Sequence, residues 1–159
     1  MKTLHQSVEP ITNVNGMLGL TLASIQVANN QDLINFTTTC GRVFVMYHNQ
    51  DCCEEVEIED ICGDLKDLIG SPLTNSEEVS NYHKAFSLIH PTNKEEESDD
   101  SFTWTYYKFD TNKGGVTIRW FGTSNGYYSE DVDFKEITQI DEYESYLNIS
   151  NGKTPHTVF

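Results

Sequence analysis

The stretch from His48 to Glu54 holds one histidine, two carboxylates and two adjacent cysteines within seven residues. Zinc uses such ligands, but structural zinc sites pair two ligands with a second, separate pair, and no second pair follows here. A Cys–His pair could supply a nucleophile and its base, but nothing in the sequence indicates a lowered thiol pKa. We predict no metal, cofactor or catalytic residue, with a Cys/His hydrolase or phosphodiesterase as minor alternatives.

The two adjacent cysteines, Cys52 and Cys53, raise a separate question about their surroundings. If they lie in a strand, they point to opposite faces, which disfavours a bond between them. One of them then fills the core, as small buried thiols often do. In a reducing cytosol all four cysteines of the chain stay free thiols.

An acidic stretch follows directly and runs from Asp51 to Asp67. Its acids do not have the spacing of an EF-hand loop, so it does not predict a calcium site. It is either a solvated face or an anionic surface that competes with nucleic acid for a basic partner. The acids are Asp51, Glu54, Glu55, Glu57, Glu59, Asp60, Asp64 and Asp67, against the single Lys66.

Aromatic residues, Arg119 and small polar residues cluster on two predicted strands and the turn after them. Aromatic rings stack on bases, arginine pairs with phosphate, and Asn or Ser can bond a ribose or a base edge. An arginine among aromatics is equally often a buried ion-pair partner. The ligand-binding residues that we predict are Trp104, Tyr107, Arg119, Trp120, Ser124, Asn125, Tyr127 and Tyr128, with His48, Gln50 and Asp51.

The elements that position these residues are predicted to be strands. Alternating or β-branched runs separated by turn residues favour an all-β fold, an antiparallel sandwich or a small barrel with few short helical turns. A single turn is expected over 64–69, an ambiguous strand over 77–89 and a short helix over 140–147. The expected strands are 18–28, 33–39, 42–48, 54–61, 102–109, 116–121 and 127–134.

Length and charge bound the class of protein. The chain has 159 residues and a formal net charge of −15. That suits one domain and disfavours non-specific nucleic-acid binding, which needs clustered Lys and Arg. No apolar run is long enough to span a membrane or to make a signal peptide, so we expect a cytoplasmic protein without membrane contact. We divide the chain into an arm (1–17), a core (18–135) containing an acidic loop (91–101), and a C-terminal extension (136–159).

The core resembles an uncharacterised small domain family common in bacteriophage genomes. The residues that carry the resemblance read HxQDCCE over 48–54, IEDIxGDLxDLIGSP over 58–72, TWTxY over 103–107, and TIRWxGxSNGYYSE over 117–130. Shorter matches are Glu77-Glu78 and Lys113-Gly114. The family brings no established reaction and no catalytic residues.

The resemblance implies a phage protein that acts against host defence in the cytoplasm of the infected bacterium. Our leading hypothesis is a homo-oligomer that binds and sequesters an immune signalling nucleotide, a cyclic dinucleotide or an ADP-ribose derivative, without cleaving it. The alternative is an acidic DNA mimic, or another protein inhibitor, that blocks a host defence nuclease. The net charge favours the alternative, and the aromatic–Arg119 cluster favours the first.

Overall fold

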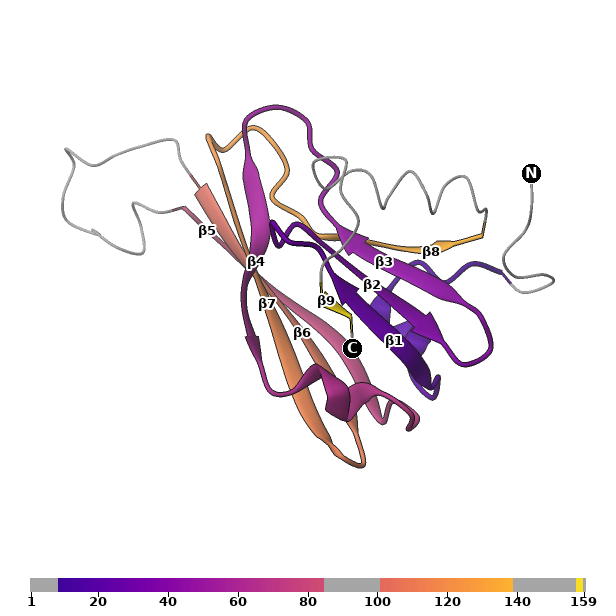
Figure 1. Ribbon diagram of the computed structural model, residues 1–159. Helices are drawn as coiled ribbons and strands as arrows, with labels where there is room; N and C mark the ends of the chain where they lie inside the picture. The colour runs from indigo at the N-terminus through magenta and orange to yellow at the C-terminus, as the bar shows by residue number, and fades with distance from the viewer. Residues whose placement is uncertain (1–8, 85–100, 139–156, 159) are drawn as a thin grey trace.

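The protein is an antiparallel β sandwich, as the strand pattern predicts (Figure 1). The computed structural model describes residues 9–84, 101–138 and 157–158. The first sheet has the order β8 (Asp133–Ile137), β3 (Val43–Tyr47), β2 (Leu33–Thr38), β1 (Leu22–Val27) and β9 (Thr157–Val158). The second has the order β4 (Glu55–Cys62), β7 (Gly114–Ser124), β6 (Ser101–Thr111) and β5 (Asn75–Lys84). These described strands do not close into a barrel.

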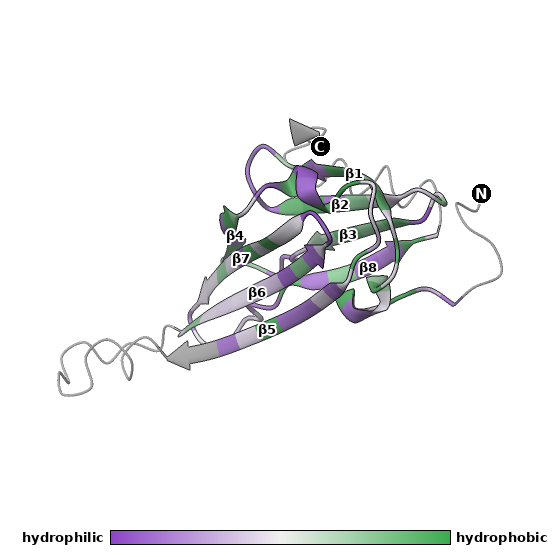
Figure 2. Ribbon diagram, turned by 90° about the horizontal axis from the view of Figure 1, so that it is seen from below, coloured by the Kyte–Doolittle hydropathy of each residue, from purple (hydrophilic) through white to green (hydrophobic). Residues whose placement is uncertain are grey.

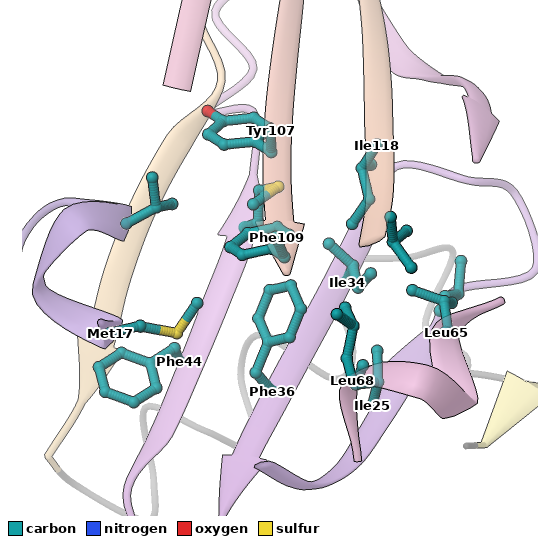
Figure 3. Packing of buried hydrophobic residues seen from close by; sticks show 14 of the residues in the cluster. Met17, Ile25, Ile34, Phe36, Phe44, Leu65, Leu68, Tyr107, Phe109 and Ile118 are labelled. Atoms are coloured by element: carbon teal, nitrogen blue, oxygen red, sulfur yellow. The ribbon is translucent and has the colours of Figure 1, made fainter. Parts of the chain in front are cut away.

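The core lies between the sheets because alternate residues of each strand point inward. Phe36 of β2 meets Phe109 of β6 with ring centroids 5.6 Å apart, and Figure 3 shows these rings between the two layers. The 3-10 turns η1 (Val14–Met17) and η2 (Leu65–Leu68) add buried side chains at the edges of this core. The core therefore fixes which face of every strand points outward.

The first sheet is covered on both faces. A second buried cluster, on the side of the sheet away from the core, is formed by Ala28, Leu33, Val43, Val45 and Ile137. Both faces of the alternating 42–48 segment are largely apolar, which predicts a central strand covered on both sides. The structure confirms this prediction, because β3 lies between β2 and β8 and four of its five residues are buried. Figure 2 shows hydrophobic stretches on β1 and β3, whereas β5 is mostly hydrophilic.

Several expected elements differ from those observed. A strand was expected over 127–134, but the chain is irregular from 125 to 132 and β8 begins at Asp133. The expected N-terminal arm contributes to the core, because Val14 and Met17 in η1 are buried. Strict alternation from Val56 and Ile58 would point the Asp60 side chain inward. A bulge between Ile58 and Asp60 turns it outward instead. The expected helix over 140–147 and most of the acidic loop lie outside the described residues.

Among the described residues, no helix has the length and apolar character needed to cross a membrane.

Candidate binding face

The outward positions of β6 and β7 form a line of four aromatic side chains and one arginine. We call it the aromatic strip, and its members are Phe102, Trp104, Tyr106, Arg119 and Phe121. Strand alternation exposes them, because the residues between them point into the core. Trp104 and Phe121 are opposite each other with ring centroids 4.5 Å apart, and Phe102 lies 5.9 Å from Phe121. All five are only partly buried, although polar residues usually occupy the wet face of a sheet.

Arg119 lies over the Trp104 ring and is held by a weak ion pair with Asp60. Its guanidinium carbon is 5.0 Å from the Trp104 ring centroid, which is a cation–π contact. Its Nη2 is 3.9 Å from a carboxylate oxygen of Asp60, and both side chains are more than a third exposed. Its Nε is buried and has no hydrogen-bond partner among the described residues. The guanidinium therefore keeps donor capacity for a further acceptor.

Carboxylates border the strip along its β4 edge. On β4, Glu55, Glu57 and Asp60 point outward and pair in register with Thr123, Phe121 and Arg119. On β5, Glu77 lies on the same face, beside the exposed Val79. The predicted acidic surface thus exists and adjoins the predicted aromatic cluster, so one face combines rings with negative charge.

Two predicted ligand-binding residues point away from this face. Trp120 and Tyr107 are core residues, 0% and 1% exposed. The Trp120 indole N–H donates to the sulfur of Met46, 3.2 Å away in the other sheet. Burial, followed by the charge and hydrogen bond of Glu78, raises the pKa of Tyr107, whose hydroxyl donates to Glu78. Neither side chain can contact a ligand on the aromatic strip.

His48 is buried and is hydrogen-bonded at both ring nitrogens. Its Nε2 is 2.9 Å from Glu54 Oε2, and its Nδ1 is 2.7 Å from the carbonyl oxygen of Asp131. Both ring nitrogens are therefore already engaged in hydrogen bonds. His48 is therefore not available as a base for Cys52 or Cys53, which removes the geometry that a Cys/His hydrolase built on this histidine would need.

Glu54 organises the loop between β3 and β4. Its carboxylate accepts hydrogen bonds from the backbone N–H of Asp51 (3.0 Å) and Cys52 (2.8 Å) and from the Gln50 amide (3.1 Å). Burial by itself raises the pKa of Glu54. The hydrogen bonds from Cys52, His48 and Asp51 together outweigh that effect and lower the pKa to about 2. The Gln50 side chain and the Asp51 backbone thus hold the loop through Glu54, and the Asp51 side chain is exposed.

The remaining predicted residues lie at the end of β7 and in the turn after it. The Ser124 hydroxyl donates to buried Glu130 (2.5 Å), which also accepts from Thr103 (2.8 Å) and Ser101. Asn125 accepts from the backbone N–H of Tyr127 and so closes the turn. Tyr127 is 84% exposed and packs edge-on against Tyr128. A cavity of about 260 Å³ lies between this turn and the 53–55 segment.

Cys52 and Cys53 lie in a bend of the loop, not in a strand, and Cys53 lines that cavity. Their sulfurs are therefore together, 2.7 Å apart, and both side chains are exposed. The expectations of opposite faces and of a cysteine in the core are wrong for this pair. Its hydrogen bond with Cys52 raises the pKa of Cys53, and a hydrogen bond with Cys52 raises that of Tyr128.

A larger cavity of about 410 Å³ opens on the other side of β6. Its lining includes the carboxylates Glu78, Asp131 and Asp133 together with Ser80, Thr105 and Val132. Within the described ranges, no group of three His, Cys, Asp or Glu side chains is arranged to hold a metal ion.

Sequence reasoning missed Phe102, Tyr106 and Phe121. The signal was present in the two hairpin strands, where every second residue from 102 to 108 and from 117 to 123 shares the face of Trp104 or Arg119. Choosing residues by strand parity would have added these three and removed Tyr107 and Trp120.

The fold and site therefore define an antiparallel β sandwich with an exposed aromatic face bordered by carboxylates. The chain belongs to the family described as Domain of unknown function (DUF7448), whose model matches residues 11–134. That match includes the aromatic strip, the acidic border and the cysteine pair. No curated protein and no solved structure matches the chain.

Proposed function

We propose that this protein is a non-catalytic binding protein whose aromatic strip and acidic border together dock onto a basic surface of another protein. The observation that carries the proposal is the exposed contact between Trp104, Phe121 and Arg119 on a sheet face that would otherwise be polar. Aromatic residues and arginine are enriched at protein interfaces and supply most binding hot spots.

The charge of the border favours a basic partner. Glu55, Glu57 and Asp60 face outward along one edge of the strip, and the whole chain carries a net charge of −15. An anionic ligand approaching the strip meets these carboxylates, whereas a Lys- or Arg-rich surface is attracted and steered by them. The aromatic centre then supplies apolar contact area inside a charged rim.

Sequestration of a signalling nucleotide is the second candidate. The partly exposed guanidinium of Arg119 favours it, because a guanidinium held over a ring can bond a phosphate while a base stacks on Phe121 or Phe102. The ligand classes are those expected from the sequence, cyclic dinucleotides and ADP-ribose derivatives. A nucleotide must overcome the nearby carboxylates, which is why we rank this function second.

The biological setting of either function follows from the sequence resemblance. A phage protein in the cytoplasm of an infected bacterium would act on a host defence system, as an inhibitor of a basic nuclease in the first case. A homo-oligomer is part of the second case, since a nucleotide on an open sheet face is better enclosed by another copy.

The first experiment is capture of partners from a bacterial lysate by immobilised wild-type protein and four variants. Trp104→Ala and Arg119→Ala remove the centre, and the double variant Glu55→Lys/Glu57→Lys reverses the border. The matched control is Glu9→Lys/Asp131→Lys, which changes the net charge equally at exposed positions away from the strip. A partner lost from all three test proteins and kept by the control supports the proposal. A partner unaffected by Trp104→Ala contradicts it.

Native mass spectrometry separates the two functions. The protein is measured alone, to give its oligomeric state, and then with cyclic dinucleotides and ADP-ribose. Intact nucleotide retained by wild type but not by Arg119→Ala supports sequestration over protein docking. A nucleotide returned in cleaved form overturns both, because each requires a protein without catalysis.

A further inference from the structure

We propose that Cys52 and Cys53 form a reactive vicinal dithiol, a modification site that takes small-molecule disulfides and closes reversibly to an internal disulfide. This site is independent of the proposed docking function. Three observations carry it: the distance between the sulfurs, their exposure, and a cavity beside them that can admit a reagent.

The geometry brings the two sulfurs together before any bond exists. They lie 2.7 Å apart as free thiols, against about 2.05 Å in a disulfide. The bend that brings them together is held by Glu54, which accepts from the Cys52 backbone N–H at 2.8 Å and is paired with His48. The two sulfurs therefore start close to bonding distance.

The other two cysteines provide an internal contrast. Cys40 and Cys62 are also exposed, but their hydrogen-bond partners are Thr38 and Asp60, respectively. A small disulfide that reacts with either of them leaves a mixed disulfide that no adjacent thiol in the sequence can resolve. Only proximity to a second sulfur distinguishes the Cys52–Cys53 pair chemically.

The reaction is two successive thiol–disulfide exchanges. One cysteine thiolate attacks a sulfur of the small disulfide, the S–S bond breaks, and the first small thiolate leaves. The second cysteine loses its proton and attacks the mixed disulfide at the protein sulfur, which forms the Cys52–Cys53 bond and expels the second small thiolate. Two protein thiols are oxidised, one small disulfide is reduced, and the two protons end on the released thiols.

The product is readily reversed. Consecutive α-carbons joined by a trans peptide are about 3.8 Å apart, which is shorter than the span of ordinary disulfides and makes the bond easier to reduce. An exposed, strained disulfide is the labile kind that responds to its surroundings. Excess small thiol therefore reopens the pair.

The site's charge selects among small disulfides. Of the residues that line the cavity, Glu54 and Glu55 carry carboxylates and the others are uncharged: Cys53, Thr123, Ser124, Asn125 and Tyr128. A cationic disulfide is attracted and an anionic one is repelled, and added salt reduces the difference. Cystamine should therefore react faster than glutathione disulfide.

The test treats the folded protein with cystamine, 2-hydroxyethyl disulfide or glutathione disulfide, alkylates the remaining thiols and maps each cysteine by mass spectrometry. We expect Cys52 and Cys53 to lose two hydrogens, carry no adduct and regain alkylation after dithiothreitol. Mixed disulfides should last at least about ten-fold longer on Cys40 and Cys62. Persistent adducts on Cys52 or Cys53, continued alkylation of both, or a covalent dimer through them would overturn the proposal.

Variants make the assignment independent of folding. Cys53→Ser should stop the reaction at a mixed disulfide on Cys52, whereas Cys40→Ser/Cys62→Ser should close the pair as wild type does. Circular dichroism of each variant verifies that the sandwich is intact. Internal closure that persists in Cys53→Ser through another cysteine would contradict the proposed pairing.

Discussion

The outer faces of the two sheets carry apolar side chains, but they differ in how these side chains are covered. On the first sheet, Leu33, Val43, Val45 and Ile137 are buried. On the second, the rings of Phe102, Trp104 and Phe121 remain partly exposed and are bordered by carboxylates. The first arrangement stabilises the fold, whereas the second leaves apolar area available for a partner.

The chain's two arginines give the largest contrast between these sheets. Arg42 forms a buried, two-pronged pair with Glu136 (2.9 and 2.7 Å), whereas Arg119 is partly exposed over Trp104. Arg42→Ala leaves Glu136 charged and buried, so we expect the free energy of unfolding to fall by about 3–5 kcal/mol. Arg119→Ala should cost at most about 1 kcal/mol. Urea denaturation measures both, and equal losses would break the comparison.

Matched valines test coverage directly. Val45 is 1% exposed on the first sheet and Val79 is 42% exposed on the second. Val45→Ala should lower the free energy of unfolding by about 2 kcal/mol, through lost apolar burial and the cavity left behind. Val79→Ala should change it by less than about 0.5 kcal/mol. A large loss for Val79→Ala in thermal or urea denaturation would mean that the second face is covered too.

Asn35, on the first sheet, offers a substitution that should raise the free energy of unfolding. It is 1% exposed on β2, and neither its amide oxygen nor its amide nitrogen has a hydrogen-bond partner among the described residues. Replacing this amide with an apolar side chain removes an unsatisfied buried group, so Asn35→Val should raise the free energy of unfolding by about 1–2 kcal/mol. The same change at exposed Asn81 is the control. Lower stability for Asn35→Val would show that the amide has a structural role.

Acid should weaken the loop that leads into the second sheet. The pKa of Glu54 is lowered from 4.5 to about 2, so its contribution to stability is complete above pH 4.5 and is lost as the pH falls toward 2. Glu54→Gln removes that contribution and should flatten stability between these values. Glu55→Gln, which changes the exposed neighbouring carboxylate, is the control. Denaturation midpoints measured at steps across this range check the expectation.

The sequence predicted the strands well because strand and turn residues alternate clearly along the chain. The expected strands 102–109 and 116–121 are observed within β6 and β7, which a tight turn after Thr111 joins, and β3 has the central position that its sequence predicts. The irregular 125–132 segment was not predictable, because its apolar residues resemble a strand, whereas its conformation depends on Ser124, Glu130 and a carbonyl bound by His48.

The candidate site was only partly predictable. Arg119 and Trp120 are adjacent in one strand and must point to opposite faces, so they cannot share one site. The sequence predicted the acidic face but could not distinguish Glu54, which holds the loop from inside, from exposed Glu55. That distinction, like the approach of Cys52 to Cys53, depends on a loop conformation that no periodic pattern encodes.

The opposite placement of the two tryptophans makes the molecule its own optical reporter. Trp120 is buried in the core and contacts Met46. Its fluorescence maximum should therefore lie at short wavelength, and dissolved quenchers should not reduce its emission until the sandwich unfolds. Trp104 should emit further to the red. Because carboxylates border the strip and the chain carries a net charge of −15, caesium ions should quench it more efficiently than iodide. One spectrum thus separates occupancy of the outer face from loss of the fold, without any added dye.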